Sequence, residues 1–180
     1  MAEVFKNSVS RAVGVVTTYT SLYVGAGSTI ISNFVSTAGI NTGDMVDSLY
    51  FIGGTKVASI GATFVTTDQT STNGADTTGQ VARFMGVTTS YTAPGGTKAI
   101  LIGGTFANNT GNQVNMTIEL VDTSSGITAS IASKIPVPAG SSFVLSDAGK
   151  TVLEPTDSLT VYCDANNALD VSLSILEGVN

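Results

Sequence analysis

Asp44 and Asp47 are the first residues in the chain whose types and spacing could do chemistry. Two nearby carboxylates can act as general acid and base, or their oxygens can hold a cation. Asp44 follows Gly43, however, and an Asp in such a turn commonly hydrogen-bonds its own backbone two residues on. The sequence contains no histidine, which removes the usual general base and the Ser/His/Asp triad. We therefore predict a local role in a turn for both residues.

A second group of oxygen-bearing side chains lies toward the C-terminus. Asp157 follows Pro155, and Asp164 precedes Asn166 and Asn167. Calcium prefers oxygen ligands of this kind, but the spacing matches no EF-hand or repeat loop. We expect these side chains to cap loops by hydrogen bonding to backbone groups. The sequence therefore predicts no metal site and no cofactor.

Two glycine pairs and one cysteine also have a functional and a structural interpretation. Gly53-Gly54 and Gly103-Gly104 could cradle a phosphate, but neither pair is followed by a helix-forming stretch or by Lys-Ser/Thr. We expect bends or bulges there, where backbones approach closely. Cys163, the single cysteine, alternates in step with Leu159 and Val161, so we predict a buried thiol with no nucleophilic role.

The tyrosines could form a platform on which sugar rings stack. There are five of them and no tryptophan. They are Tyr19, Tyr23, Tyr50, Tyr91 and Tyr162. Scattered tyrosines at strand edges are common in β-sandwiches, so we favour structural roles. With no catalytic, cofactor-binding or metal-binding residues predicted, we expect that the protein is not an enzyme.

The composition argues against several other functional classes. Only 11% of the residues are charged, whereas about 25% is typical of soluble domains. The net charge is −6, and the seven basic residues form no positive stripe that could bind nucleic acid. Apolar runs fall far short of the roughly 20 residues that cross a bilayer. We expect no nucleic-acid or membrane partner, and synthesis in the cytoplasm because the first residues lack a secretory pattern.

Alternation of apolar and polar residues recurs along the chain, and no helical periodicity is sustained. It is clearest in Gln113–Asp122, Ser158–Cys163 and Leu169–Ile175. Clusters of Asn, Asp, Pro, Ser and Gly separate such segments and mark turns. These features predict an all-β fold, an antiparallel β-sandwich or jelly roll.

The first half of the chain contains a repeat. Arg11–Thr20 recurs as Arg83–Thr92 at an offset of 72 positions, with Arg, Gly, Val, Thr, Tyr and Thr matched. Two copies of one strand around unrelated sequence suggest an insertion bounded by direct repeats, although two Thr- and Val-rich strands can also resemble each other by chance. We predict a β-sandwich domain of residues 1–19 plus 92–180, and an inserted β-rich domain of residues 20–91.

Short strands are expected within the insert. The candidates are Thr29–Thr37, Gly43–Val46, Gly53–Ile60 and Ala62–Thr66. Thr67–Thr78 has no apolar residue except Ala75, and we predict an exposed linker or loop there.

Several patches of the sequence resemble proteins of tailed phages. Ser36–Val46 with Gly53–Ile60 resembles a module of phage structural and fibre-associated proteins. Val4–Gly14, resumed at Tyr91–Thr97, resembles small virion proteins of cyanophage-like and other marine tailed phages. The likeness continues through Ile135–Ser142 and Val152–Leu159. The resemblance implies a virion structural role, of the capsid decoration or head/tail accessory type.

We therefore expect a structural component on the outer surface of a tailed-phage virion, most specifically a capsid decoration (cement) protein. The alternatives are a neck, collar, tail or fibre-attachment protein and, in a different class, a module that binds a host glycan. The expected partners are other copies of the chain, with a trimer as one form, and virion proteins such as the major capsid protein. Val4 and Phe5 are the candidate assembly contacts, because their N-terminal segment is too short to bury them alone.

Overall fold

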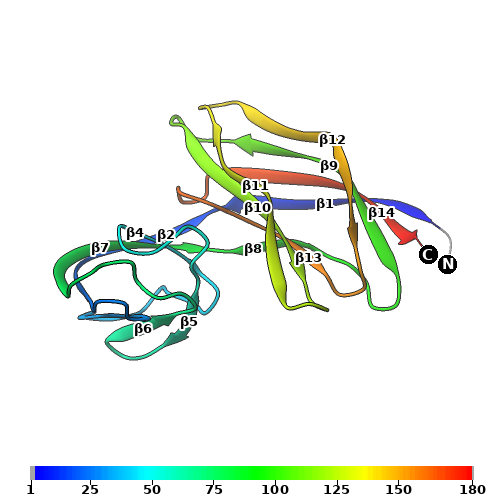
Figure 1. Ribbon diagram of the computed structural model, residues 1–180. Coiled ribbons are helices and arrows are strands. Elements are labelled where there is room, and N and C mark those ends of the chain that lie inside the picture. The colour runs from blue at the N-terminus through cyan, green and yellow to red at the C-terminus, as the bar shows by residue number, and fades with distance from the viewer. Residues whose placement is uncertain (1–2, 180) are drawn as a thin grey trace. The chain divides into compact units, whose positions relative to one another are not determined.

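The computed structural model describes residues 3–179, apart from the side chains of residues 147–150. The described residues form fourteen β-strands and no helix, and every strand pair is antiparallel (Figure 1). The all-β fold class predicted from the sequence is confirmed. No helix in this part of the chain could span a membrane.

The chain forms two compact units. Unit 1 consists of Met1–Gly14 and Thr88–Asn180, and unit 2 consists of Val15–Val87. Both boundaries lie earlier in the chain than those expected from the repeat, Tyr19/Thr20 and Tyr91/Thr92. The difference has a physical cause: the residues after Gly14 pair with a strand of unit 2, and the residues after Val87 pair with a strand of unit 1.

Unit 1 contains two four-stranded sheets. Their strands are β1 (Val4–Val13), β8 (Thr88–Thr92), β9 (Lys98–Asn108), β10 (Val114–Asp122), β11 (Ile127–Val137), β12 (Ser142–Leu153), β13 (Ser158–Cys163) and β14 (Leu169–Val179). The sheet orders are β1-β14-β9-β12 and β11-β10-β13-β8. The three ranges with the clearest alternation correspond to β10, β13 and β14.

The pairing of these eight strands is that of a jelly roll. Taken in chain order, the first strand pairs with the last (β1 with β14) and the second with the seventh (β8 with β13). The third pairs with the sixth (β9 with β12) and the fourth with the fifth (β10 with β11). A long hairpin rolled into two sheets gives this arrangement. The predicted sandwich is therefore present, and its topology is the jelly roll.

One hydrophobic core lies between the two sheets of unit 1. Phe106, Met116, Ile118, Leu159 and Leu173 are among its fully buried side chains. They come from alternate positions of strands in both sheets, and they meet between the sheets as the inner faces of a sandwich do. Burial of a side chain of this size contributes about 1.5–3 kcal/mol, so the core is the main stabilising feature of the unit.

Unit 2 is a small closed barrel. Its strands are β2 (Val15–Val24), β3 (Ile30–Ser32), β4 (Met45–Ser48), β5 (Val57–Ile60), β6 (Phe64–Thr67) and β7 (Thr77–Gly86), in the order β4-β7-β2-β3-β6-β5. The two ends of this sheet also bond to each other: Gly43 N–H donates to the Val57 carbonyl over 2.8 Å, and Val46 N–H donates to the Thr55 carbonyl over 2.9 Å. Closure leaves the sheet without a free edge.

The barrel has its own core, in which Tyr19, Phe34 and Phe84 make edge-on and tilted ring contacts at 5.0–5.9 Å between centroids. Four short strands were expected here, and β3, β4, β5 and β6 correspond to them. The first is much shorter than predicted, because the chain leaves the sheet after Ser32.

The exposed loop predicted at Thr67–Thr78 is present over residues 68–76, most of which are exposed and none of which lies in a strand. The two ends of this segment belong to β6 and β7, and Ser71 and Asn73 between them are buried. Their side chains donate hydrogen bonds to the carbonyls of Gly25 (2.8 Å) and Val24 (3.1 Å) respectively. These two bonds anchor the loop to backbone carbonyls between β2 and β3 and at the end of β2.

Each copy of the repeat contains a point at which the chain passes from one unit to the other. The first copy is divided after Gly14 and the second after Val87, so matching residues lie in different sheets. Gly14 has φ +120°, and a Cβ atom there would collide with the Ala165 carbonyl oxygen and the Cys163 sulfur. The first passage therefore requires glycine at this position.

Candidate interaction surface on the jelly roll

The outer face of the β1-β14-β9-β12 sheet carries an ordered set of exposed side chains. Strand alternation sends Val171, Leu173 and Ile175 of β14 into the core, so Ser172, Ser174 and their neighbours point outward. Antiparallel registers then align outward residues of all four strands in rows across the sheet. The face is a candidate interaction surface, which we call the outer face.

One row on the outer face is wholly apolar. It runs Phe5, Leu176, Ile100, Val152 from β1 across to β12. The Phe5 ring is 79% exposed, and Val152 is 48% exposed at the other edge. Cross-strand neighbours of this kind pack against one another and present a continuous apolar band to a partner.

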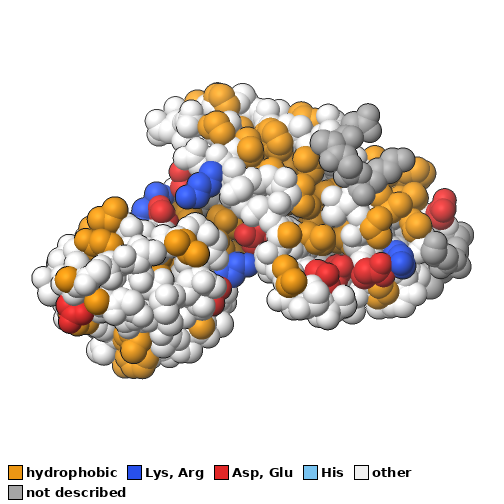
Figure 2. Space-filling view, viewed as in Figure 1, with side chains coloured by type: hydrophobic (Ala, Val, Ile, Leu, Met, Phe, Trp, Pro, Cys, Tyr) orange, Lys and Arg blue, Asp and Glu red, His pale blue; other side chains and the backbone are white. Residues whose placement is uncertain are grey.

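A second row, Val9-Ser172-Thr105-Val144, combines hydroxyl groups with two exposed valines. On the face of the molecule drawn in Figure 2, hydrophobic side chains are widely distributed and charged side chains are few. Surfaces with few charges are typical of the centres of protein–protein interfaces.

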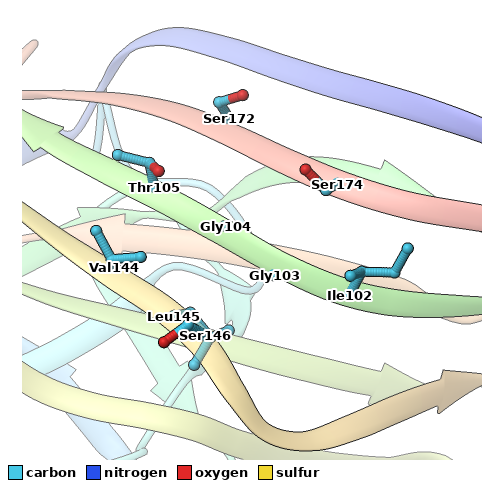
Figure 3. A pocket seen from close by; sticks show the side chains of 9 residues that line it. All are labelled: Ile102, Gly103, Gly104, Thr105, Val144, Leu145, Ser146, Ser172 and Ser174. Atoms are coloured by element: carbon cyan, nitrogen blue, oxygen red, sulfur yellow. The ribbon is translucent and has the colours of Figure 1, made fainter.

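A shallow hollow of about 470 Å³ lies between these two rows (Figure 3). Ser146 and Ser174 contribute hydroxyl groups to it, and Ile102 and Val144 contribute apolar side chains. Gly103 forms part of its floor, and a Cβ atom there would lie 2.8 Å from the Leu145 carbonyl oxygen. The hollow therefore depends on the close approach of β9 and β12.

Charged groups lie near the ends of β1. Arg11 Nε is 3.6 Å from Asp170 Oδ2, and its side chain is 83% exposed. Toward the other end, Lys6 Nζ lies 3.1 Å from Glu177 Oε1, which also accepts a hydrogen bond from the Tyr91 hydroxyl at 2.8 Å. Burial, followed by the bond to Glu177, raises the pKa of Tyr91.

The candidate assembly contacts Val4 and Phe5 belong to β1, which forms an edge of its sheet. They were expected on an arm, but the segment pairs with β14 from Val4 to Ser10. Val4 is 54% exposed, and Phe5 is more exposed still. Both side chains remain available to a partner, while the backbone that carries them is fixed by one neighbour.

The structure separates the carboxylates of Asp44 and Asp47. Asp44 is buried and accepts a hydrogen bond from the Asn41 N–H over 2.7 Å, which caps the turn before β4. Its pKa is raised by burial, partly offset by this hydrogen bond. Asp47 is exposed and lies 3.6 Å from Arg83. The turn role predicted for Asp44 is confirmed, but its partner is three residues earlier in the chain. The same prediction is wrong for Asp47, which lies within β4 and pairs with Arg83 of the neighbouring strand.

The carboxylates near the C-terminus hold loops together. Asp157 accepts hydrogen bonds from the N–H groups of Thr123 (3.0 Å) and Glu154 (2.9 Å), and Asp164 accepts two from Asn115 (2.8 and 2.7 Å). The predicted loop-capping role is confirmed for both. In the described part of the chain, no group of three Asp, Glu, His or Cys side chains could hold a metal ion.

Cys163 is buried, as predicted from alternation. Its Sγ lies 3.2 Å from the Ala165 carbonyl oxygen, and burial raises the pKa of the thiol. Gly103 confirms the expected close backbone approach, and Gly54 has φ +95° in the turn before β5.

The tyrosines form no common platform. Tyr19 packs in the core of unit 2, the Tyr23 hydroxyl donates to Asp76 at 2.6 Å, and Tyr91 and Tyr162 are buried in unit 1. Their structural roles agree with the interpretation favoured from the sequence.

The rows of the outer face could not be derived from sequence reasoning alone. Alternation gives the side on which a residue lies, but a row depends on the register between strands that are distant in the chain. Sequence reasoning identified Phe5 as a contact residue, but it missed the exposed Val9, Val144 and Val152. Each of these three is a valine on the side of its strand where alternation predicts polar, solvent-facing residues, and this exception was the available signal.

No protein-family model matches the sequence, and no curated protein matches it. Among solved structures, the crystal structure of the STIV MCP aligns with 99% of this chain and 92% of its own, at 10% identity and a TM-score of 0.34. The Arthrobacter globiformis T6 isomalto-dextranase complexed with panose aligns with 97% of this chain at 14% identity and a TM-score of 0.23. This chain covers only 34% of that enzyme. Neither alignment is close enough to assign a function.

Proposed function

We propose that this protein is a non-enzymatic structural component of a tailed-phage virion, and specifically a capsid decoration protein on the outer surface. The observation that supports this most is a jelly roll whose outer face carries exposed apolar rows and few charges. Jelly rolls recur in viral capsids, although the fold alone does not assign a function. The resemblance of the sequence to small virion proteins points the same way.

A structural role also fits the positions of the groups that could have done chemistry. The two carboxylates of the candidate acid/base pair differ in burial and in bonding partners, and the thiol has a raised pKa. A nucleophile or general base needs the opposite: an accessible group and a pKa matched to its task. The observed positions favour an assembly protein.

The proposed partners are further copies of the chain and other virion proteins, such as the major capsid protein. An exposed apolar row is stabilised when a neighbour covers it, at about 25 cal/mol for each Å² of apolar surface removed from water. A protein of this kind gains stability when it binds to a lattice, because binding favours the folded state by mass action.

The direct test is the location of the protein. An antibody raised against the purified chain would be used to label intact, purified particles of the phage that encodes it. Labelling over the head is expected. Labelling of the neck, tail or fibres would replace the decoration role by the tail-associated alternative. Particles without label and without the protein by mass spectrometry would overturn the virion assignment.

The hydroxyl-lined hollow is the one observation that favours a glycan-binding module. Hydroxyl groups beside apolar side chains can hold a sugar, and some lectin domains are jelly rolls. A glycan array with the purified protein tests this alternative. Specific binding that Ser146→Ala and Ser174→Ala together remove would support it.

A further inference from the structure

Strand β1 is an edge strand whose hydrogen-bonding partner on one side is β14. The pairing is regular from Val4 to Ser10, and irregularity begins only after Ser10. On the core side of the strand, the Ser8 hydroxyl donates to the Ser90 carbonyl (2.5 Å) and Ser10 bonds the Ser90 hydroxyl (3.2 Å). The strand is therefore held in place by β14 and by Ser90, while its other backbone edge lies outside the sheet.

The outward side chains of this segment form a symmetric series. Strand alternation places Phe5, Asn7 and Val9 outward, and Glu3 just before β1 continues this phase. Arg11 lies past the regular pairing, and its approach to Asp170 adds it to the series. All five are exposed: Phe5 at 79% and Val9 at 64%. The series is acidic at one end, basic at the other and apolar on both sides of a central amide. When two copies of this segment run antiparallel, the acidic end of one faces the basic end of the other, and the apolar residues face each other.

We propose that β1 pairs antiparallel with β1 of a second copy of this chain, about a twofold axis at Asn7. This register places Glu3 opposite Arg11 of the second copy, and Phe5 opposite its Val9. The axis repeats both contacts, as an isologous interface requires. The four-stranded sheet becomes a continuous sheet of two copies, and the outer faces join. The inference rests on the proposed assembly role and supplies its self-association contact.

The core-side residues of β1 agree with this register. Lys6 falls opposite Ser8 of the second copy, and Val4 falls opposite its Ser10, so no like charges meet. Residues directly opposite in an antiparallel pair have Cβ atoms about 4.5–5.5 Å apart, close enough for the Phe–Val and Glu–Arg contacts. Arg11 can contact Glu3 of the second copy as well as Asp170 of its own chain, because its side chain is largely exposed.

One edge strand of the other sheet, β11, is protected against such pairing. In β11, Lys134 has φ +51° at an irregularity of the β10–β11 register, and Pro136 lacks an N–H donor. Charged residues, bulges and proline are the usual means by which an edge strand avoids pairing. Between Val4 and Ser10, β1 has neither proline nor bulge, and its one charged side chain, Lys6, lies on the core side and pairs with Glu177.

Disulfide cross-linking of the full chain tests the register. Asn7→Cys places two thiols on the proposed axis, at a Cα separation of about 4.5–5.5 Å that a disulfide can span. Mild oxidation should convert most of the variant to a covalent dimer at micromolar concentration. Ser174→Cys is the matched control, since Ser174 is the neighbour of Asn7 in the same outward row. Ser142→Cys reports on the opposite edge, β12.

Dimer from the Asn7 variant with little from the two controls supports the proposal. Dimer from Ser174→Cys instead would show that the faces stack, and dimer from Ser142→Cys would show that β12 is the contact. Either result overturns the proposal, as does the absence of a covalent dimer in all three variants. Cys163 is buried and should contribute no background.

Reversing the charges of Glu3 and Arg11, singly and together, tests the register in a second way. Recovery of the dimer in the double variant could not result from misfolding. Glu3→Arg and Arg11→Glu, made singly, should each raise the dimer dissociation constant by about tenfold, because two attractive pairs become repulsive. The double variant should restore dimer formation to within about threefold of the original protein. Failure of restoration, with both single variants folded by circular dichroism, would contradict the register.

These results are independent of the test of virion location. A protein that labels the phage head but gives no Asn7 cross-link retains the proposed function and loses this contact. A protein that cross-links at Asn7 but is absent from particles has the contact without the proposed function. Sedimentation also separates the twofold pair from the trimer expected from the sequence.

Discussion

Gly103 is the residue on which the shape of the outer face depends most. A Cβ atom there would press on the Leu145 carbonyl, which belongs to the paired strand β12 and cannot rotate away. We expect Gly103→Ala to lower the stability of unit 1 by about 1–3 kcal/mol, as overpacking does. Gly111→Ala is the control, because a Cβ atom at Gly111 meets nothing within 4 Å. Thermal melts of both variants make the comparison. Equal melting temperatures would show that β9 and β12 can separate without cost.

Asp122 links stability to pH. Hydrogen bonds from Ser125 and Ser124 lower its pKa to about 2, below its ordinary value of 3.8. A depressed carboxylate pKa stabilises the folded state above the ordinary pKa, and this contribution is lost as the pH falls from about 4 to about 2. We therefore expect the melting temperature of Asp122→Asn to fall less steeply over this interval than that of the unmodified protein. Parallel curves would contradict the assignment.

Asp44 and Asp47 test the proposal that the protein is not an enzyme. We expect the double change to Asn to alter stability only modestly, because the Asn41 N–H keeps an oxygen acceptor and the Asp47–Arg83 pair is partly exposed to solvent. The raised pKa of Asp44 makes its charged form unfavourable above the ordinary pKa, so the neutral amide should be better tolerated at pH 7 than at pH 4. Turnover of a polysaccharide or peptide that the double change abolishes would overturn the non-enzyme proposal.

Individual elements differed in how far the sequence could predict them. β10, β13 and β14 each send alternate apolar side chains into the core, so alternation marks them, and their predicted ranges agree with the structure. The polar side chains expected on a wet face of β10 and β13, among them Thr117, Glu119 and Thr160, are buried as well. β11 is exposed along most of its length, which leaves no apolar phase to detect. The loop before β7 is mostly exposed, as its polar composition predicts, but Ser71 and Asn73 within it are buried because their side chains bond to backbone carbonyls of distant segments. Composition cannot reveal such partners.

The repeat makes a prediction about β8. Deleting Thr20–Tyr91 leaves Val15–Tyr19 between Gly14 and Thr92. Val16–Tyr19 then stands where Thr88–Tyr91 begins β8 in the intact protein. We expect the shortened chain to fold as a jelly roll with one cooperative melt. Tyr19 would then take the place of Tyr91 and donate to Glu177. Circular dichroism and thermal melting check the fold.

A single substitution in the shortened chain tests this replacement. Tyr19→Phe should remove about 1.5–3 kcal/mol of stability if the hydroxyl bonds the Glu177 carboxylate there. Unfolded or aggregated product from the deletion would mean that the repeated strands are not interchangeable.

At the scale of the whole molecule, the sequence predicted the fold class and the presence of an insert, and the structure adds the topology of each unit. Two features depend on pairings between distant residues and had no local signal: the closure of the barrel between Gly43–Val46 and Thr55–Val57, and the rows of the outer face. The proposed assembly role rests on the outer face of the jelly roll, so it is tested best on the assembled particle.

The most direct measurement is an averaged electron-microscopy map of the phage particle. We expect density for the jelly roll on the outside of the head, in symmetry-related copies, with the outer face of the β1-β14-β9-β12 sheet against a neighbouring protein. Density only at the neck or tail would replace the decoration role by the tail-associated one. A map that accounts for every surface protein of the particle and contains no copy of this fold would contradict the proposed function.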